Sequence, residues 1–297
     1  MIKSLDNPLS GTETLNQKTP DWLLDMEKLG YLPYVATSER LLPCFNTKPF
    51  GKEAACFTIE NADHQPFLEA YLLSNSLSFE KQESKMPHWV LVDCVLLQTA
   101  VVGFMKKVSE VPESLLKYYQ EDENVDLDKL TYLPVSGQIA GLAADGKSVV
   151  GLSLFSLGPK LGEPVGLGLY TKGLALEALR ADQLEYVFGI TQYDNRSLRI
   201  HGRFADKMEI YQPIVPLHPY KDMTLVYRMA LNYDPYNLKE KLADKEPTFW
   251  LKATDKESKE RMQAAMTEGK RFYIAPPFIV DRDGELFLPI IEEEATR

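Results

Sequence analysis

Residues 148–204 constrain the fold more than any other part of the chain, because a strand, a glycine-containing loop, a helix, a second strand and a second helix follow one another there. The strand patterns are SVVGLSLFSLG (148–158) and LEYVFGITQ (184–192), and the helix pattern between them is TKGLALEALRADQ (171–183). This order predicts an α/β arrangement.

The second strand stops at Tyr193-Asp194-Asn195, and the polar helix RSLRIHGRF (196–204) follows at once. Two explanations are open. A ligand could occupy the place where the strand gives way to the helix. Alternatively, the segment is an ordinary strand–turn–helix in which Asp194 or Asn195 caps the helix.

The 297 residues are 44% hydrophobic and 26% charged, which is typical of a globular protein with a sizeable core. The net charge of −10 argues against a nucleic acid or an anionic membrane as partner. The three cysteines lack metal-binding spacing, and the N-terminus lacks the apolar core of a signal peptide. The longest apolar run, residues 89–105, is too short and too polar to span a bilayer. We therefore expect a soluble cytoplasmic protein with reduced thiols and no bound metal.

Helices and strands are also predicted before this region. Helices are expected from Pro20 to Gly30 and over residues 65–77, with proline-broken loops between them. Strands are expected over 89–98 and 99–108, followed by the charged insertion PESLLKYYQEDENVDLDKL. A β-hairpin is then predicted, in which YLPVSGQIAGLAA and SVVGLSLFSLG flank a turn at residues 144–147.

The segment after residue 204 predicts one more strand, KDMTLVYRMAL, and then a tail. The tail contains a helix that starts with a capping box at Thr254 and ends at Gly269, and a hairpin around residues 281–284. We therefore divide the chain into an N-terminal helical and loop extension (1–85), a core (86–231) and a C-terminal appendage (232–297).

Gly166 and Gly168 lie in the loop that opens the helix expected near Tyr170. Backbone N–H groups at a helix start have no intrahelical partner, and glycines let a phosphate approach them. The loop therefore suits a pyrophosphate, although any strand-to-helix connection can carry glycines for chain reversal. The spacing matches neither the Rossmann fingerprint nor the P-loop.

The segment from Gly166 to Phe204 resembles the core of the GNAT superfamily of acyl-CoA-dependent N-acetyltransferases. In that family a strand leads into a Gly-x-Gly loop and a helix whose N-terminus binds the pyrophosphate of coenzyme A. A further strand and a patterned helix follow, and the residues in register with that pattern here are Ser197, Leu198, Ile200, His201 and Phe204. The resemblance extends over residues 148–230. It implies an α/β (α+β) fold with a mixed, mainly antiparallel sheet flanked by helices.

This resemblance implies that the strands at 148–158 and 184–192 lie side by side and splay apart at their C-terminal ends. The pantetheine arm of acetyl-CoA or another acyl-CoA would fill the gap. The implied cofactor-binding residues are Leu157, Gly166, Leu167, Gly168, Leu169, Tyr170, Thr171, Asn195 and Ser197. A backbone N–H near Ser156 or Leu157 would polarise the thioester carbonyl.

His201 stands where the family often carries a Tyr or His near the sulfur, so we expect it to donate the proton to the leaving thiolate. Tyr211 and Tyr193 are alternative donors. The general base is open, with Glu163 and Asp145 as weak candidates. The aromatic residues between 31 and 57 could line an acceptor pocket, although packing in the core explains them better.

Three hypotheses follow. The first is an acyltransferase that acts on an amine of a small molecule or a protein, with an acyl carrier protein as an alternative donor and a homodimer as an alternative state. The second is an inactive GNAT-like module that binds a ligand or protein, because Pro164-Val165 replace the usual basic residue of the loop. The third is another α/β enzyme that uses the loop for a different phosphate ligand.

Overall fold

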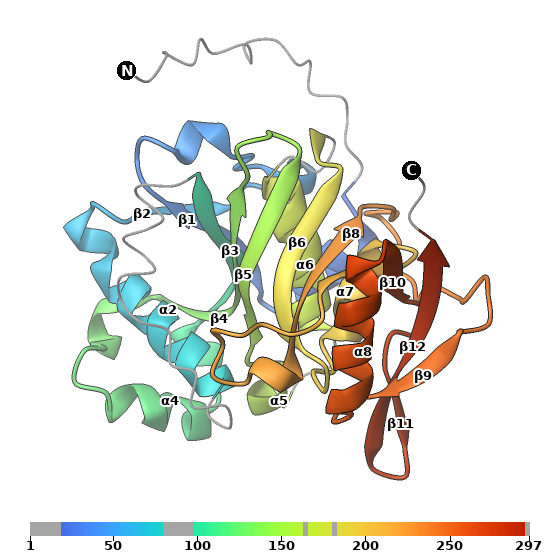
Figure 1. The fold of residues 1–297 in the computed structure, drawn as a ribbon. Coiled ribbons are helices and arrows are strands. Elements are labelled where there is room, and N and C mark those ends of the chain that lie inside the picture. Colours follow the sequence, from blue (N-terminus) through green and yellow to red (C-terminus); the bar gives the residue numbers. More distant parts are fainter. Residues whose placement is uncertain (1–18, 80–97, 163–165, 180–182, 295–297) are drawn as a thin grey trace.

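The computed structural model describes residues 19–79, 98–162, 166–179 and 183–294 (Figure 1). Its strands form one 12-stranded sheet in the order β11-β12-β10-β7-β8-β6-β5-β4-β3-β1-β2, with β9 paired to β12. Most neighbouring strands are antiparallel, and only β1–β2 and β5–β6 are parallel. The predicted fold class, a mixed and mainly antiparallel sheet flanked by helices, is confirmed. The predicted strand at 89–98 lies outside the described residues except for Gln98.

The central strands follow the predicted order. They are β3 (Thr99–Lys107), β4 (Tyr132–Leu142), β5 (Ser148–Ser156), β6 (Tyr186–Gln192), β7 (Met208–Gln212) and β8 (Thr224–Ala230). The charged insertion between β3 and β4 contains α4 (Glu113–Gln120). Because β8 lies between β6 and β7, the polypeptide crosses over between these strands.

The N-terminal region contains strands where loops were predicted. After α1 (Asp21–Lys28), β1 (Leu32–Thr37) and β2 (Ala55–Thr58) extend the edge of the sheet. The prediction failed because Pro33 was taken to break regular structure. Pairing of β1 with β2 begins only at Tyr34, so the missing N–H of Pro33 removes no hydrogen bond to β2.

The sheet separates two helical layers. Successive residues of a strand point to opposite faces, and β4 shows which helix covers each face. A Cβ atom on Gly137 would lie 2.8 Å from the Tyr71 ring of α2 (Gln65–Ser78). The neighbouring hydroxyl of Ser136 is 2.6 Å from that of Thr171 in α6 (Leu167–Ala178). In Figure 1, α2 accordingly lies in front of the sheet and α6 behind it.

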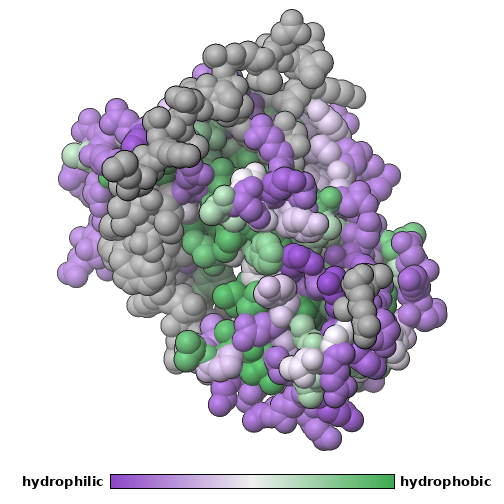
Figure 2. Space-filling view, turned by 45° about the horizontal axis from the view of Figure 1, so that its top comes forward, coloured by the Kyte–Doolittle hydropathy of each residue, from purple (hydrophilic) through white to green (hydrophobic). Residues whose placement is uncertain are grey.

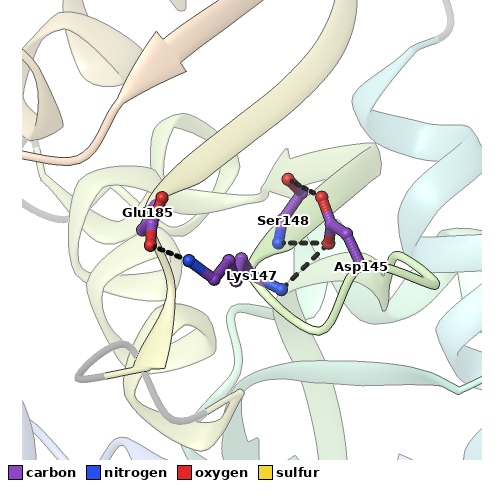
Figure 3. A network of polar contacts seen from close by, with 4 residues as sticks. All are labelled: Asp145, Lys147, Ser148 and Glu185. Carbon is purple, nitrogen blue, oxygen red and sulfur yellow. Dashed lines mark hydrogen bonds and ion pairs between the residues drawn. The ribbon is translucent and has the colours of Figure 1, made fainter.

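A polar network holds the starts of β5 and β6 together (Figure 3). The Asp145 carboxylate accepts hydrogen bonds from the backbone N–H groups of Lys147 and Ser148 and from the Ser148 hydroxyl, at 2.6–2.9 Å. The Lys147 ammonium forms an ion pair of 2.5 Å with Glu185, and the Glu185 N–H donates to the Lys147 carbonyl. The predicted hairpin is confirmed, and its turn also fixes the register of the next strand.

The C-terminal segment joins the same sheet. It comprises β9 (Phe249–Lys252), α8 (Lys256–Thr267), β10 (Lys270–Ile274), β11 (Val280–Arg282) and β12 (Glu285–Glu294), and β10 pairs with β7. Helix α8 is capped by the side chain of Asp255, which accepts from the Ser258 N–H at 3.0 Å, and not by Thr254 as predicted. The predicted hairpin around 281–284 is confirmed as β11–β12.

This segment also supports the short helix α7 (Leu198–His201), which follows β6. The Arg199 guanidinium donates to the Ile279 carbonyl at 3.0 and 3.1 Å. Phe278, at φ 67°, places its ring against Gly202, where any Cβ atom would overlap the ring. The part of the chain predicted to be an appendage therefore fixes α7 against the sheet. Within the described ranges, no helix has the length and apolar character needed to cross a bilayer.

The contact between Gly202 and Phe278 predicts a stability defect. Gly202→Ala should lower the free energy of unfolding by about 1–3 kcal/mol, because the added methyl group overlaps a ring held by its backbone. Urea denaturation would measure this change. Gly168→Ala is the control, since its Cβ atom would meet Ile200 at an ordinary 3.4 Å, and equal stability of the two variants would contradict the prediction.

Candidate functional site

The two parallel strands β5 and β6 pair along only part of their length. Four residue pairs connect them, from Ser148 with Tyr186 to Gly151 with Gly189. Beyond this last pair, and among the described strands, β5 continues to Ser156 paired only with β4, and β6 continues to Gln192 paired only with β8. The predicted splaying of these strands is confirmed. We call the region between their diverging ends the split; Gly151 and Gly189 form its closed end.

A β-bulge lies beside the closed end. Ile139 of β4 pairs with Ser153, whereas Ala140 pairs with Gly151, so Leu152 is an extra residue without a partner on β4. A bulge bends its strand and leaves the extra residue outside the hydrogen-bond ladder. It therefore contributes to the divergence of β5 from β6 and leaves backbone groups of Leu152 free for a ligand.

Helix α6 begins at the open end of the split. Gly166, at φ 141°, is its N-cap, so the helix starts three residues earlier than predicted. No side chain caps the first turn, which leaves the N–H groups of Leu167, Gly168 and Leu169 without an intrahelical or side-chain partner. A Cβ atom on Gly168 would lie 3.7 Å from the Ser156 Cβ, and this contact places the helix start beside the end of β5.

Other predicted cofactor residues have structural partners. The Leu157 N–H donates to the Val135 carbonyl at 2.8 Å, so it cannot polarise a thioester carbonyl as expected. The Tyr170 ring stacks on Trp22, with centroids 5.0 Å apart, and the Thr171 hydroxyl donates to the Leu167 carbonyl. The side chains of Tyr170 and Thr171 therefore pack into the protein body.

The turn after β6 is built by its own polar residues. The Asn195 side chain accepts from the Ser197 N–H at 2.9 Å, so Asn195 caps the turn that leads into α7. The Tyr193 hydroxyl donates to the Pro213 carbonyl at 2.9 Å and is buried, which makes it a structural residue. The Ser197 hydroxyl has no hydrogen-bond partner among the described residues. The capping explanation of this turn is therefore sufficient for Asn195, while Ser197 is free to contact a ligand.

His201 is buried behind the sheet with a lysine as its partner. The Lys172 Nζ of α6 lies 2.6 Å from His201 Nδ1, and it also lies over the Phe204 ring. Within the described part of the chain, no carboxylate acts on the charge of either group. Burial holds the pKa of Lys172 well below its usual value. The pKa of His201 is also lowered, first by burial and then by the neighbouring lysine.

Two further side chains meet at the closed end of the split. Gln138 of β4 reaches over Gly151, whose Cβ atom would lie 3.4 Å from the amide nitrogen. Tyr227 of β8 reaches over Gly189, which has no room for a Cβ atom because the phenol oxygen occupies that space. The Tyr227 and His201 ring centroids are 5.4 Å apart. A chain of polar groups therefore runs from the split to Lys172.

The opposite face of the same strands is apolar and exposed. Val150, Leu152, Ile190 and Tyr211 are 38%, 58%, 58% and 58% exposed, and the Tyr211 ring contacts Phe188 from the other side of β8. Figure 2 shows apolar residues gathered in a hollow in the middle of this side of the molecule, between hydrophilic residues. Tyr211 and His201 therefore approach the split from opposite faces of the sheet.

The remaining candidates that the structure describes lie away from the split. Asp145 belongs to the turn before β5, at the opposite end of the strand, and its hydrogen bonds from Ser148 and Lys147 lower its pKa, which weakens it as a base. Glu163 lies outside the described residues. Tyr31, Tyr34, Phe45 and Phe50 are buried in the core and Phe57 packs against it, which confirms packing as their role. The described part of the chain contains no cluster of metal-binding side chains.

Sequence reasoning missed Gln138 and Tyr227. Both lie in ordinary strand patterns, and only the pairing of β4 and β8 with the two glycine-bearing strands brings them together. One signal was present, because a Gly in each of two neighbouring strands indicates close approach of another group.

Neither a protein family model nor a curated protein matches this sequence. The chain is similar to an acetyltransferase from Streptococcus agalactiae, at 15% identity and a TM-score of 0.36, over 58% of this chain and 94% of the other. It is also similar to Tetrahymena GCN5, at 12% identity and a TM-score of 0.32, over 60% of this chain and 96% of the other. Nourseothricin acetyltransferase matches at 12% identity and a TM-score of 0.28, and the 45% of this chain that matches spans only 65% of that protein.

The buried Lys172–His201 pair predicts a pH dependence of stability. Because the folded state lowers the Lys172 pKa, the unfolded state binds one more proton, and stability rises with pH up to about 10.4, the pKa of an unperturbed lysine. Relative to Lys172→Met, the wild-type free energy of unfolding should therefore rise with pH between pH 7.5 and 9.5, by up to about 1 kcal/mol per pH unit.

Chemical denaturation of both proteins at pH 7.5, 8.5 and 9.5 would measure the difference. Lys259, whose pKa burial lowers to about 8, is present in both proteins, so its contribution cancels. Parallel pH profiles for the two proteins would show that Lys172 is charged in the folded state.

Proposed function

We propose that this chain is an acyl-CoA-dependent N-acyltransferase, which moves an acetyl or other acyl group from a thioester to an amine. The observation that carries the proposal is the split, where β5 and β6 stop pairing at Gly151 and Gly189 although both strands continue. The facing edges keep backbone N–H and C=O groups that need partners. The amide groups of a pantetheine arm are suited to pair with both edges.

The first turn of α6 is the proposed pyrophosphate site. The N–H groups of Leu167, Gly168 and Leu169 point away from the helix body, and the positive end of the helix dipole favours an anion there. The contact of Gly168 with Ser156 places these groups beside the open end of the split. A cofactor bound at this turn would extend its arm toward Gly151, with Ser197 as a further contact.

The proposed chemistry uses groups on both faces of the closed end. The carbonyl of the thioester is polarised by the backbone of Leu152, which replaces the expected donor Leu157. The proton for the leaving thiolate comes from the Lys172–His201 pair through Nε2 of His201. The pair can hold one proton but not two, because two positive charges 2.6 Å apart would repel each other strongly. Burial disfavours the positive charge of the protonated pair, so the pair releases its proton readily. The negatively charged thiolate accepts that proton.

The acceptor amine is assigned to the face formed by Val150, Leu152, Ile190 and Tyr211. This face adjoins the closed end, and its exposed apolar side chains would contact an apolar body attached to the amine. Tyr211 is the alternative proton donor. It belongs to the face assigned to the acceptor amine, on the opposite side of the sheet from His201. A carrier-protein donor and a homodimer remain predictions.

The first test is cofactor binding. Thermal denaturation with acetyl-CoA, free CoA and pantetheine should show a rise in melting temperature with the first two; at 100 times the dissociation constant a ligand adds about 2.7 kcal/mol. Ser156→Phe should abolish the shift by filling the open end, whereas Leu217→Phe, at a fully exposed position, should retain it. An unchanged melting temperature with all three compounds would remove the proposal.

The second test is catalysis. With a panel of amines, release of free thiol should fall about 100-fold or more in kcat for His201→Phe, the range typical of a lost general acid, with KM for acyl-CoA little changed. Tyr211→Phe is the matched variant on the opposite face and should retain most of the activity. Because His201 must be protonated to donate and its pKa is lowered, wild-type kcat should decrease as pH rises through that lowered pKa.

The opposite ranking of the two variants would transfer the donor role to Tyr211. Binding of acyl-CoA without thiol release for any amine would instead favour the alternative function, a catalytically inactive ligand- or protein-binding module.

A further inference from the structure

Two buried polar atoms beside the split have no hydrogen-bond partner within the described part of the chain. They are Oε1 of Gln138, a residue only 3% exposed, and Oγ1 of Thr191, which is 7% exposed. Leaving a buried acceptor without a donor costs about 1–3 kcal/mol, so folded proteins rarely retain such atoms without a reason. Both atoms therefore indicate a ligand that completes their hydrogen bonds.

Both side chains lie on the α6 side of the sheet. Gly137 points toward Tyr71 of α2, so its neighbour Gln138 points the other way. Thr191 lies two residues after Gly189 and shares its face, onto which the Tyr227 phenol folds. The Tyr227 phenol oxygen lies close to where a Cβ atom on Gly189 would be, so its hydroxyl is at the closed end. Three polar side chains thus surround the closed end on the face opposite the exposed apolar surface.

The length of the split decides which part of an acyl-CoA meets these groups. Five residue steps along β5 lead from Ser156, beside the start of α6, to Gly151, and they span about 17 Å. A pantetheine arm that is anchored at the start of α6 and extended along β5 would span about this length and end near Gly151. The thioester therefore lies near Gly151 and Gly189, and its acyl group is the part that reaches Gln138 and Tyr227.

We propose, on the basis of the acyltransferase function above, that the transferred acyl group is short and carries an uncharged hydrogen-bonding substituent, with a hydroxyl as the simplest case. Gln138 Oε1 can only accept, so it requires an O–H or N–H from the ligand. The hydroxyls of Tyr227 and Thr191 can donate in return to the oxygen of that substituent. A plain alkyl chain would leave Gln138 Oε1 and Thr191 Oγ1 without partners, and a carboxylate has no proton to give to Gln138.

The substituent takes no part in the reaction. The amine nitrogen forms the new C–N bond, the thioester C–S bond breaks, and the proton lost by the amine is balanced by the one that the thiolate gains. The hydrogen bonds to Gln138 and Tyr227 select the acyl group and hold its carbonyl at the bulge.

The matched pair of 3-hydroxybutyryl-CoA and butyryl-CoA tests the proposal, because the two differ by one hydroxyl. Isothermal titration of the full chain should give a dissociation constant at least about 10-fold lower for the hydroxylated ester. Gln138→Leu should reduce this preference to less than about 3-fold, and it should not lower the melting temperature of the free protein because the amide oxygen has no partner to lose. Gln263→Leu, the same change on the exposed side of α8, should keep the preference.

Three other outcomes would separate a failure of this inference from a failure of the proposed function. Equal affinity of the wild-type protein for both esters, with clear binding of free CoA, would overturn the inference while the acyltransferase proposal stands. Weaker binding of free CoA by Gln138→Leu would assign the glutamine to the pantetheine arm and also overturn it. Failure of the wild-type protein to bind free CoA or either ester would remove the proposed function itself.

Discussion

The site depends on a parallel ladder that is held at one end and interrupted at the other. The turn at Asp145 and the contacts between Lys147 and Glu185 fix β5 against β6 where both strands begin, and pairing stops at Gly151 and Gly189. The exposed ion pair contributes little by itself, because such pairs are screened by water. Its backbone hydrogen bonds matter more, since they define a register that places one glycine opposite the other. From that point the bulge in β5 and the partners β4 and β8 draw the two strands in different directions.

The layers on each side of the sheet give the split two unlike faces. On one face α6 and α7 close over Lys172, His201 and Tyr227, so polar groups there are removed from water. On the other face the cover by α2 ends at β5, and the exposed apolar side chains continue onto β6 and β7. A ligand held between the strands would therefore have a dry polar environment on one side and an open apolar surface on the other. This asymmetry favours a reaction in which one substrate is enclosed and a second approaches from solvent.

Local patterns predicted much of the fold and only part of the site. The hairpin and the strand–loop–helix succession follow from the spacing of apolar residues and from the turn residues. The divergence of β5 and β6 was expected from the glycine pair in the loop after β5. All of these signals act within a few residues. The strand at 32–37 was missed because Pro33 reads as a breaker, although its N–H position requires no partner. The contacts of Leu157 with Val135 and of Tyr170 with Trp22 could not be predicted, because these partners are distant in the sequence. Contacts of this kind are decided by packing, and no pattern within one strand or helix reports them.

Buried polar groups that lower the stability of the fold are concentrated on the face covered by α6 and α7. This concentration indicates that these groups are retained because they serve a function. A lysine without a carboxylate, a histidine beside it and two orphaned oxygen atoms each lower stability, and each could be replaced by an apolar residue of similar size without disturbing the fold. Elsewhere in the described chain many buried polar side chains have clear partners, such as Ser74 with Tyr119 and Lys259 with the carbonyl groups of Asp222 and Ala253. Lys172, His201, Gln138 and Thr191 belong to α6, α7, β4 and β6, around the split. Because the same sheet satisfies its polar groups in other places, we attribute the unsatisfied ones to a ligand that contacts the split from within.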